Sequence, residues 1–422
     1  MTRSGTAGGQ RPPKKAPIDM RAMERGKWAV SHIQALITPA VLKWAREQAG
    51  YDKTVAAECI GVTSEALDHW EAGTDHPSLA QARKAAQVYR RPLAVFYVSK
   101  PPLDFATPRD FRRLPGDVPR HFSPEFLFLA RSLDYRQKWL AEYRRDTGES
   151  ELAFVSSGQD RDAAALSRAI RSTLRVDIFW HRNRRTQAEA LRYWVARTEE
   201  AGVCVRRDPG IELPEARGLA LSDPWAPIIW INGKDAVAGQ LFTLAHELAH
   251  IWLGQSGVSN LALTGGEALG DAARIETFCN RTAAGLLVAP EAFEGERGRA
   301  RALSRPELIA HLSDRLRVSE EVIARMLLER RSISSSDYER LHQSLAQRWA
   351  QRAGRPRREG SPSYFTLRLA YNGRAFTEDV LRAYYDDYAT ATEASDLLDL
   401  KVNLFPRMAQ LLQRVGVSGG VR

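Results

Sequence analysis

Cysteine is scarce in this 422-residue chain, and no two cysteines are close in sequence. Cys59, Cys204 and Cys279 form an odd, widely spaced set, which excludes a Cys-x-x-Cys metal site and argues against a disulfide framework. Each has apolar neighbours, so we expect three small buried hydrophobes in a protein of the reducing cytoplasm.

Long apolar runs are also missing. No run approaches the roughly 20 residues that a membrane helix needs, so we expect no membrane partner. The basic N-terminal segment MTRSGTAGGQRPPKKAP has no apolar stretch behind it. This pattern excludes a secretory signal and predicts a disordered arm over residues 1–30 of a cytoplasmic protein.

The charge balance is basic, with a formal net charge of +10 and a pI of about 9.6. Such an excess permits contact with nucleic acid but does not indicate it, because net charge alone acts on solubility and nonspecific attraction. With 44% hydrophobic and 27% charged residues, the composition is that of a globular protein. The length predicts two or three domains.

The pattern of apolar residues predicts a mainly α fold with a small β-sheet (α+β). Short strands are expected at 202–208 and 226–232, where β-branched and aromatic residues lie between breakers. The predicted domains are a helical domain at 31–100, a Pro-rich connector at 101–125, and a large domain at 126–350. A basic linker at 351–363 and a small C-terminal α/β region at 364–422 follow. Within the large domain, helices are expected at 124–145, 160–174, 186–201, 237–254, 272–288 and 305–350, the last with a turn at 317–319.

One helix carries a recognisable chemical motif, LFTLAHELAHIWLG at 241–254. His246 and His250 are four positions apart, so a helix presents both imidazoles on one face, where they can take two corners of a zinc tetrahedron. Glu247 follows the first histidine. In this His-Glu-x-x-His arrangement the zinc acidifies a water and Glu247 is the general base.

The tetrahedron needs one more protein ligand, and no further histidine occurs before His311. The acidic candidates are Glu267, Asp271 and Glu276. The motif can also occur by chance on a charged helix. Here its flanks are apolar, so without a metal these polar groups would face a core at a cost of about 1–3 kcal/mol each.

Residues 218–290 resemble the ImmA/IrrE metallo-endopeptidase family. The matching stretches are GLALSD at 218–223, PIIWIN at 227–232, FTLAHELAH at 242–250 and IETFCNRTAAGLL at 275–287. The chain departs from the family pattern at Cys279, where the family has alanine, at Thr282, where it has phenylalanine, and in the 288–290 segment.

The resemblance implies a zincin-like metallopeptidase domain in which Glu276 is the third ligand and Glu247 the catalytic base. It implies Zn2+ as the cofactor, with Mn2+ as the alternative. It further implies that the substrate is a protein partner, an Xre-type transcriptional repressor.

Residues 53–71, KTVAAECIGVTSEALDHWE, have the spacing of a helix-turn-helix and resemble the lambda-repressor-like (Xre) class. Gly61 lies at the turn, and Thr63 or Ser64 is expected to cap the second helix. The candidate DNA contacts are Lys53, Thr54, Ser64, Glu65, Asp68 and His69. Glu65, Asp68 and Glu71 are acids that phosphate repels, so a protein-binding or dimerising module remains the alternative. The candidate contacts to the DNA backbone are the cations Lys53, Arg83, Lys84, Arg90 and Arg91.

Two functions therefore follow from the sequence. The first is a site-specific endopeptidase that controls gene expression by cutting a repressor. The second is a DNA-binding regulator or antitoxin-like protein whose peptidase-like domain senses without cutting. His311 and His342 are expected to be structural residues, and the sequence leaves the oligomeric state open.

Overall fold

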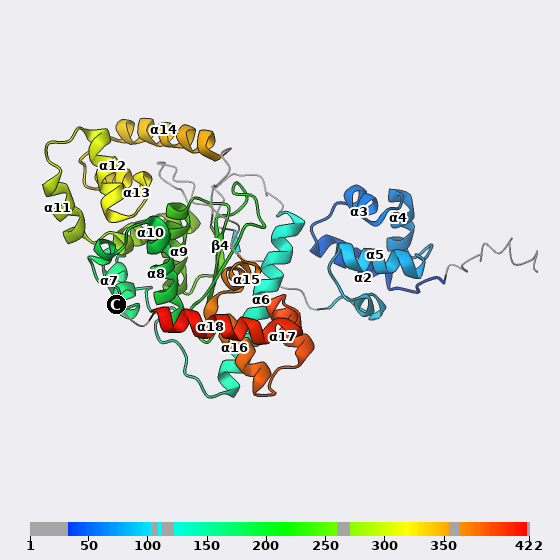
Figure 1. Cartoon of the computed structure of the whole chain (residues 1–422). Helices are drawn as coiled ribbons and strands as arrows, with labels where there is room; N and C mark the ends of the chain where they lie inside the picture. Colours follow the sequence, from blue (N-terminus) through cyan, green and yellow to red (C-terminus); the bar gives the residue numbers. More distant parts are fainter. Residues whose placement is uncertain (1–32, 103–108, 111–121, 260–270, 354–362, 420–422) are drawn as a thin grey trace, which may run out of the picture. The chain divides into compact units, whose positions relative to one another are not determined.

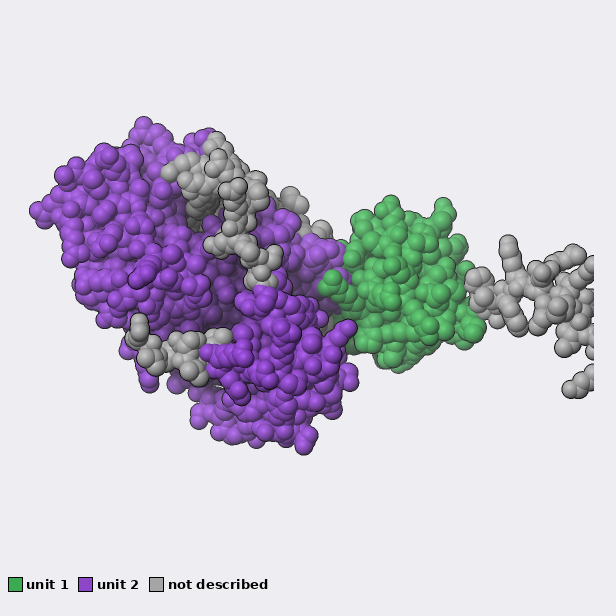
Figure 2. Space-filling view, viewed as in Figure 1, with its two compact units in different colours: residues 1–103 green, residues 104–422 purple. Residues whose placement is uncertain are grey.

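The computed structural model describes residues 33–102, 109–110, 122–259, 271–353 and 363–419 (Figure 1). The expected N-terminal arm lies outside this part of the chain. The chain divides into two compact units, Met1–Leu103 and Asp104–Arg422 (Figure 2). None of the described helices is both long and apolar enough to cross a membrane.

The first unit consists of short helices around a small core. They are α2 (Pro39–Gln48), α3 (Lys53–Ile60), α4 (Ser64–Ala72), α5 (Leu79–Val88) and the 3-10 turn η1 (Leu93–Tyr97). Gly61 ends α3 with a φ of +86°, a left-handed conformation that glycine adopts without strain. Thr63 then caps α4 by accepting a hydrogen bond from the Ala66 N–H. The sharp α3–α4 turn is therefore the one that the sequence predicts.

The second unit is built on a five-stranded sheet in the order β1-β5-β3-β4-β2. The strands are β1 (Arg109–Asp110), β2 (Cys204–Asp208), β3 (Gly218–Leu221), β4 (Ile228–Asn232) and β5 (Gly257–Ser259). β2 runs parallel to β4, and β3 runs antiparallel to β4 and β5. β2 and β4 are the two predicted strands, whereas β3 was recognised only as a family-like stretch and β5 was not predicted as a strand.

Helices cover both faces of this sheet, which explains why β4 is buried along its whole length. Ile229 and Ile231 join the core beneath α7 (Ala163–Thr173), α8 (Gln187–Glu200) and α9 (Val237–Leu253). Ile228 and Trp230 point the other way, into the core beneath α6 (Pro124–Asp146) and the C-terminal helices. The mainly α architecture with a small sheet is confirmed.

The remaining helices of the second unit follow the sheet in the chain. They are α10 (Asp271–Leu287), α11 (Pro290–Arg299), α12 (Arg305–Leu316), α13 (Glu320–Glu329) and α14 (Ser335–Ala353). The turn predicted at 317–319 separates α12 from α13. A second break, at 330–334, divides the stretch again, with Arg331 at a φ of +53°.

The C-terminal region corrects a prediction. We expected an α/β region at 364–422, but the described residues form helices throughout: α15 (Tyr364–Asn372), α16 (Arg374–Tyr385), α17 (Ala391–Leu398), η3 (Val402–Leu404) and α18 (Phe405–Gly419). Phe365, Phe376 and Phe405 join the core on the second face of the sheet. These aromatic residues are the buried sides of helices. The predicted linker begins within α14, since 351–353 are helical.

The cysteines also differ from expectation. Cys204 and Cys279 are buried, and burial raises the pKa of the Cys204 thiol to about 12, so both are inert packing residues. Cys59 is exposed on α3, which contradicts the prediction that all three are buried.

Candidate metal centre

The centre begins with α9, whose residues from Gln240 to Trp252 are all buried. This helix packs against α8, α10 and two strands, so no side of it is free for solvent. Gly254 ends it in a left-handed conformation at a φ of +69°. His246, Glu247 and His250 are therefore polar groups fixed inside a core, each 0% exposed.

The two imidazoles and one carboxylate converge on a single point between α9 and α10. His246 Nε2 lies 3.0 Å from His250 Nε2. The Glu276 carboxylate on α10 lies 3.1 Å from His250 Nε2 through Oε1 and 3.4 Å from His246 Nε2 through Oε2. Among the described residues, this is the one group of three or more His, Cys, Asp or Glu side chains with ligand atoms this close together.

This geometry fits a tetrahedral zinc. Ligand atoms about 2.0–2.2 Å from zinc lie about 3.3–3.5 Å from one another at the corners of a tetrahedron. The His246 Nε2–His250 Nε2 separation of 3.0 Å and the His250 Nε2–Glu276 Oε1 separation of 3.1 Å are within a few tenths of an ångström of that spacing. The second carboxylate oxygen, Oε2, lies 3.4 Å from His246 Nε2. Two histidines and one glutamate are also the donor set of catalytic rather than structural zinc sites.

The electrostatics favour a positive charge among these three groups. Burial opposes ionisation of Glu276, but the neighbouring imidazoles lower the pKa of its carboxyl to about 2, so it is an anion at neutral pH. Burial lowers the pKa of His250, which favours the neutral form that binds metals. Burial also opposes protonation of His246, yet the Glu276 carboxylate raises its pKa. A divalent cation bound between these groups would likewise be stabilised by the negative charge of Glu276.

Asn280 orients the first histidine. It lies one turn after Glu276 on α10, and its side-chain oxygen accepts a hydrogen bond from His246 Nδ1 at 3.0 Å. Because Nδ1 carries the proton, the neutral ring presents the lone pair of Nε2 toward His250 and Glu276. The sequence indicated Asn280 only as part of the 275–287 stretch, with no role of its own. Its position four residues after Glu276 on a helix could have indicated that it faces the same site.

The sequence also offered two other acids as the third ligand. Asp271 is the first residue of α10, and Glu267 lies outside the described residues. His342 does not belong to the group of converging ligands; its Nδ1 lies 3.2 Å from Glu321 Oε1.

Gly218 of β3 faces Glu247 directly. A Cβ atom at this position would collide with Glu247 Oε1 and would lie 2.6 Å from Thr243 Cγ2. The strand therefore needs glycine here for the helix to approach it this closely. A glycine inside a strand was the signal that sequence reasoning did not use.

We predict that Gly218→Ala displaces the Glu247 carboxylate and lowers turnover in the peptidase activity that the sequence resemblance implies by about 10–100-fold. Metal content is expected to stay the same, because no ligand is touched. Turnover and metal stoichiometry of the purified variant measure the two effects. Gly298→Ala in α11, where an added Cβ meets nothing within 4 Å, is the matched control. Unchanged turnover in Gly218→Ala would show that the close approach of Gly218 to Glu247 is not needed for activity.

The predicted DNA-contact residues lie at the start of α3 and on α4. Lys53 forms an ion pair with Asp68, so the main cation of this face is neutralised within the unit. His69 Nδ1 lies 2.8 Å from Thr74 Oγ1. Thr54 and Glu65 are exposed, and Ser64 begins α4. The candidate DNA-contact residues thus share one surface of the first unit, but this surface carries more acids than cations.

Glu71 requires a correction, because we counted it among the acids facing phosphate. Its carboxylate accepts from Arg46 Nε at 2.7 Å and Nη2 at 3.1 Å, and its side chain is only 5% exposed. Glu71 is therefore part of an α2–α4 ion pair inside the unit and not of the exposed face.

Comparison with known families agrees with this organisation. Residues 198–328 match the peptidase family model described as the IrrE N-terminal-like domain, and residues 42–96 match a helix-turn-helix model. The first match includes His246, Glu247, His250 and Glu276. No curated protein matches the chain. The chain thus contains an IrrE N-terminal-like domain preceded by a helix-turn-helix domain, as the resemblance predicted.

Proposed function

Because the chain carries an IrrE N-terminal-like domain behind a helix-turn-helix domain, we propose that it is a zinc-dependent, site-specific endopeptidase that cuts a protein partner. The partner we propose is an Xre-type transcriptional repressor, and the proposed location is the cytoplasm. Manganese is the alternative metal. The observation that carries the proposal is the convergence of His246, His250 and Glu276 beside the buried Glu247.

In this proposal His246, His250 and Glu276 hold the cation through Nε2, Nε2 and the carboxylate. A divalent cation bound there supplies a Lewis acid that polarises a carbonyl and lowers the pKa of water. Asn280 keeps His246 in the tautomer that can bind it.

Glu247 is the proposed general base. It accepts the proton of the attacking water and then passes it to the leaving amine. Its carboxylate is fully buried, which excludes bulk water from competing for the proton. Gly218 and Thr243 bound the space in which this carboxylate moves, so its position is held by packing.

A second candidate function is a DNA-binding regulator or antitoxin-like protein whose metal domain senses without cutting. The helix-turn-helix match at 42–96 favours a nucleic-acid partner. Glu247 argues against a purely sensory centre, because a structural site needs no base and closes its fourth position with Cys or His.

Incubation of the full-length protein with Xre-type repressors encoded beside its gene separates the two functions. With zinc or manganese, intact-mass analysis is expected to find one repressor cut at a single bond, and a chelator should prevent the cut. If every such repressor stays intact in both metals, the sensory function is the correct one.

A further inference from the structure

Charge is strongly segregated within the helix-turn-helix unit. Residues 76–100 contain five cations and no acid: Arg83, Lys84, Arg90, Arg91 and Lys100. Residues 52–75 contain one cation, Lys53, and six acids: Asp52, Glu58, Glu65, Asp68, Glu71 and Asp75. Glu71 is paired with Arg46 inside the unit, and the other five acids are exposed. The two halves of one small unit therefore present opposite charge, with the anionic half on the helices that a helix-turn-helix would present to DNA.

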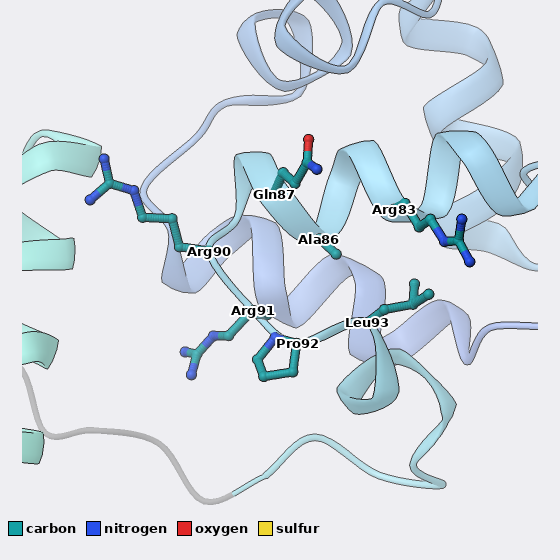
Figure 3. A pocket seen from close by; sticks show the side chains of 7 residues that line it. All are labelled: Arg83, Ala86, Gln87, Arg90, Arg91, Pro92 and Leu93. Carbon is teal, nitrogen blue, oxygen red and sulfur yellow. The ribbon is translucent and has the colours of Figure 1, made fainter. Parts of the chain in front are cut away.

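The cationic half contains a hollow of about 500 Å³, which we name the α5 pocket (Figure 3). It is lined by Arg83, Ala86 and Gln87 of α5 and by the segment 90–93 that leads into η1. Figure 3 shows Arg83 and Arg90 on either side of Ala86, with Pro92 and Leu93 between them. The pocket thus combines an apolar floor with three arginines around its rim.

Part of this rim is held in position. The Arg91 guanidinium lies over the Trp44 ring, 4.5 Å from its centroid, and this cation–π contact limits its motion. Arg83 and Gln87 are one turn apart on α5, and both are exposed. Binding therefore needs less ordering of side chains than on a flat surface.

We propose that the α5 pocket docks an acidic peptide segment of a protein partner, with one apolar side chain of that segment seated on Ala86, Pro92 and Leu93. Arginine pairs with carboxylates through two parallel hydrogen bonds, and it is enriched at protein interfaces. Nucleic acid fits less well, because a phosphate backbone has no group that uses the apolar floor. The proposal does not depend on peptidase activity.

Fluorescence anisotropy with the full-length Glu247→Gln protein tests this docking without interference from proteolysis. The probes are fluorescein-labelled Asp-Glu-Asp-Leu-Glu-Asp-Glu and the same peptide with glycine for leucine. The leucine peptide is expected to bind about tenfold more tightly, because the floor buries its side chain. Arg83→Glu and Arg90→Glu should each weaken its binding by at least about tenfold.

Lys43→Glu is the matched control, since Lys43 is an exposed cation on α2 that does not line the pocket. It should retain the affinity of the parent protein. Equal binding of the two peptides, or unchanged affinity in Arg83→Glu, would overturn the proposal. Binding of a labelled DNA duplex that both arginine variants abolish would also overturn it, because it would assign the pocket to phosphate.

Discussion

Glu247→Gln is expected to lower peptidase turnover by about 10²–10⁴-fold while zinc content stays at the level of the unchanged protein. Glutamine has the shape of glutamate but cannot accept a proton at neutral pH. Since Glu247 is not among the three converging ligand groups, the substitution leaves the cation's ligands intact. Single-turnover cleavage of the repressor and metal analysis of the same preparation measure the two quantities.

Glu321→Gln is the control for this variant. Glu321 is another buried glutamate of the same unit, and its carboxylate accepts a hydrogen bond from the Tyr338 hydroxyl instead of facing the metal centre. It should leave turnover unchanged. Full activity of Glu247→Gln would show that another group takes the proton. Loss of metal from it would show that Glu247 is a ligand.

His250→Ala is expected to weaken zinc binding by more than about 100-fold, because even loss of a group that only orients a ligand costs about 10–100-fold. The remaining His246 and Glu276 would offer two ligands where zinc takes at least three from catalytic sites. Competition with a fluorescent zinc chelator measures the affinity. Circular dichroism of the metal-free protein and variant establishes that both are folded.

His342→Ala is the matched control, because His342 also lies near a glutamate but belongs to no group of three ligands. It should bind zinc as the unchanged protein does. Equal zinc affinity in His250→Ala and the parent protein would place the metal elsewhere in the chain.

Local periodicity predicted the parts of the site that lie on one helix. The His-Glu-x-x-His spacing puts two imidazoles on one face of α9 whatever the rest of the chain does. The strands β2 and β4 were equally predictable, because a short run of β-branched and aromatic residues suits a strand buried on both faces.

Groups that meet across helices were harder to predict. Glu276 follows His250 by 26 positions, and spacing alone left two other acids as candidates; family resemblance chose among them. The Arg46–Glu71 pair joins α2 to α4, and no periodicity within either helix indicates it. Such contacts depend on how helices cross, which one helix's pattern does not contain.

The C-terminal region shows a different source of error. Gly373 separates α15 from α16, and a Cβ there would approach the Val205 carbonyl and the Glu199 carboxylate. Glu199 Oε1 accepts from the Arg374 N–H at 2.9 Å, at the start of α16. Gly373 is thus a junction of two helices close to β2, a contact that the local sequence does not contain.

Anomalous diffraction at the zinc edge, from crystals grown with zinc, tests the central claim most directly. We predict one strong peak within coordination distance of His246 Nε2, His250 Nε2 and the Glu276 carboxylate, and its loss in crystals of His250→Ala. A peak bound to other side chains, or no peak near α9 in the unchanged protein, would contradict the account.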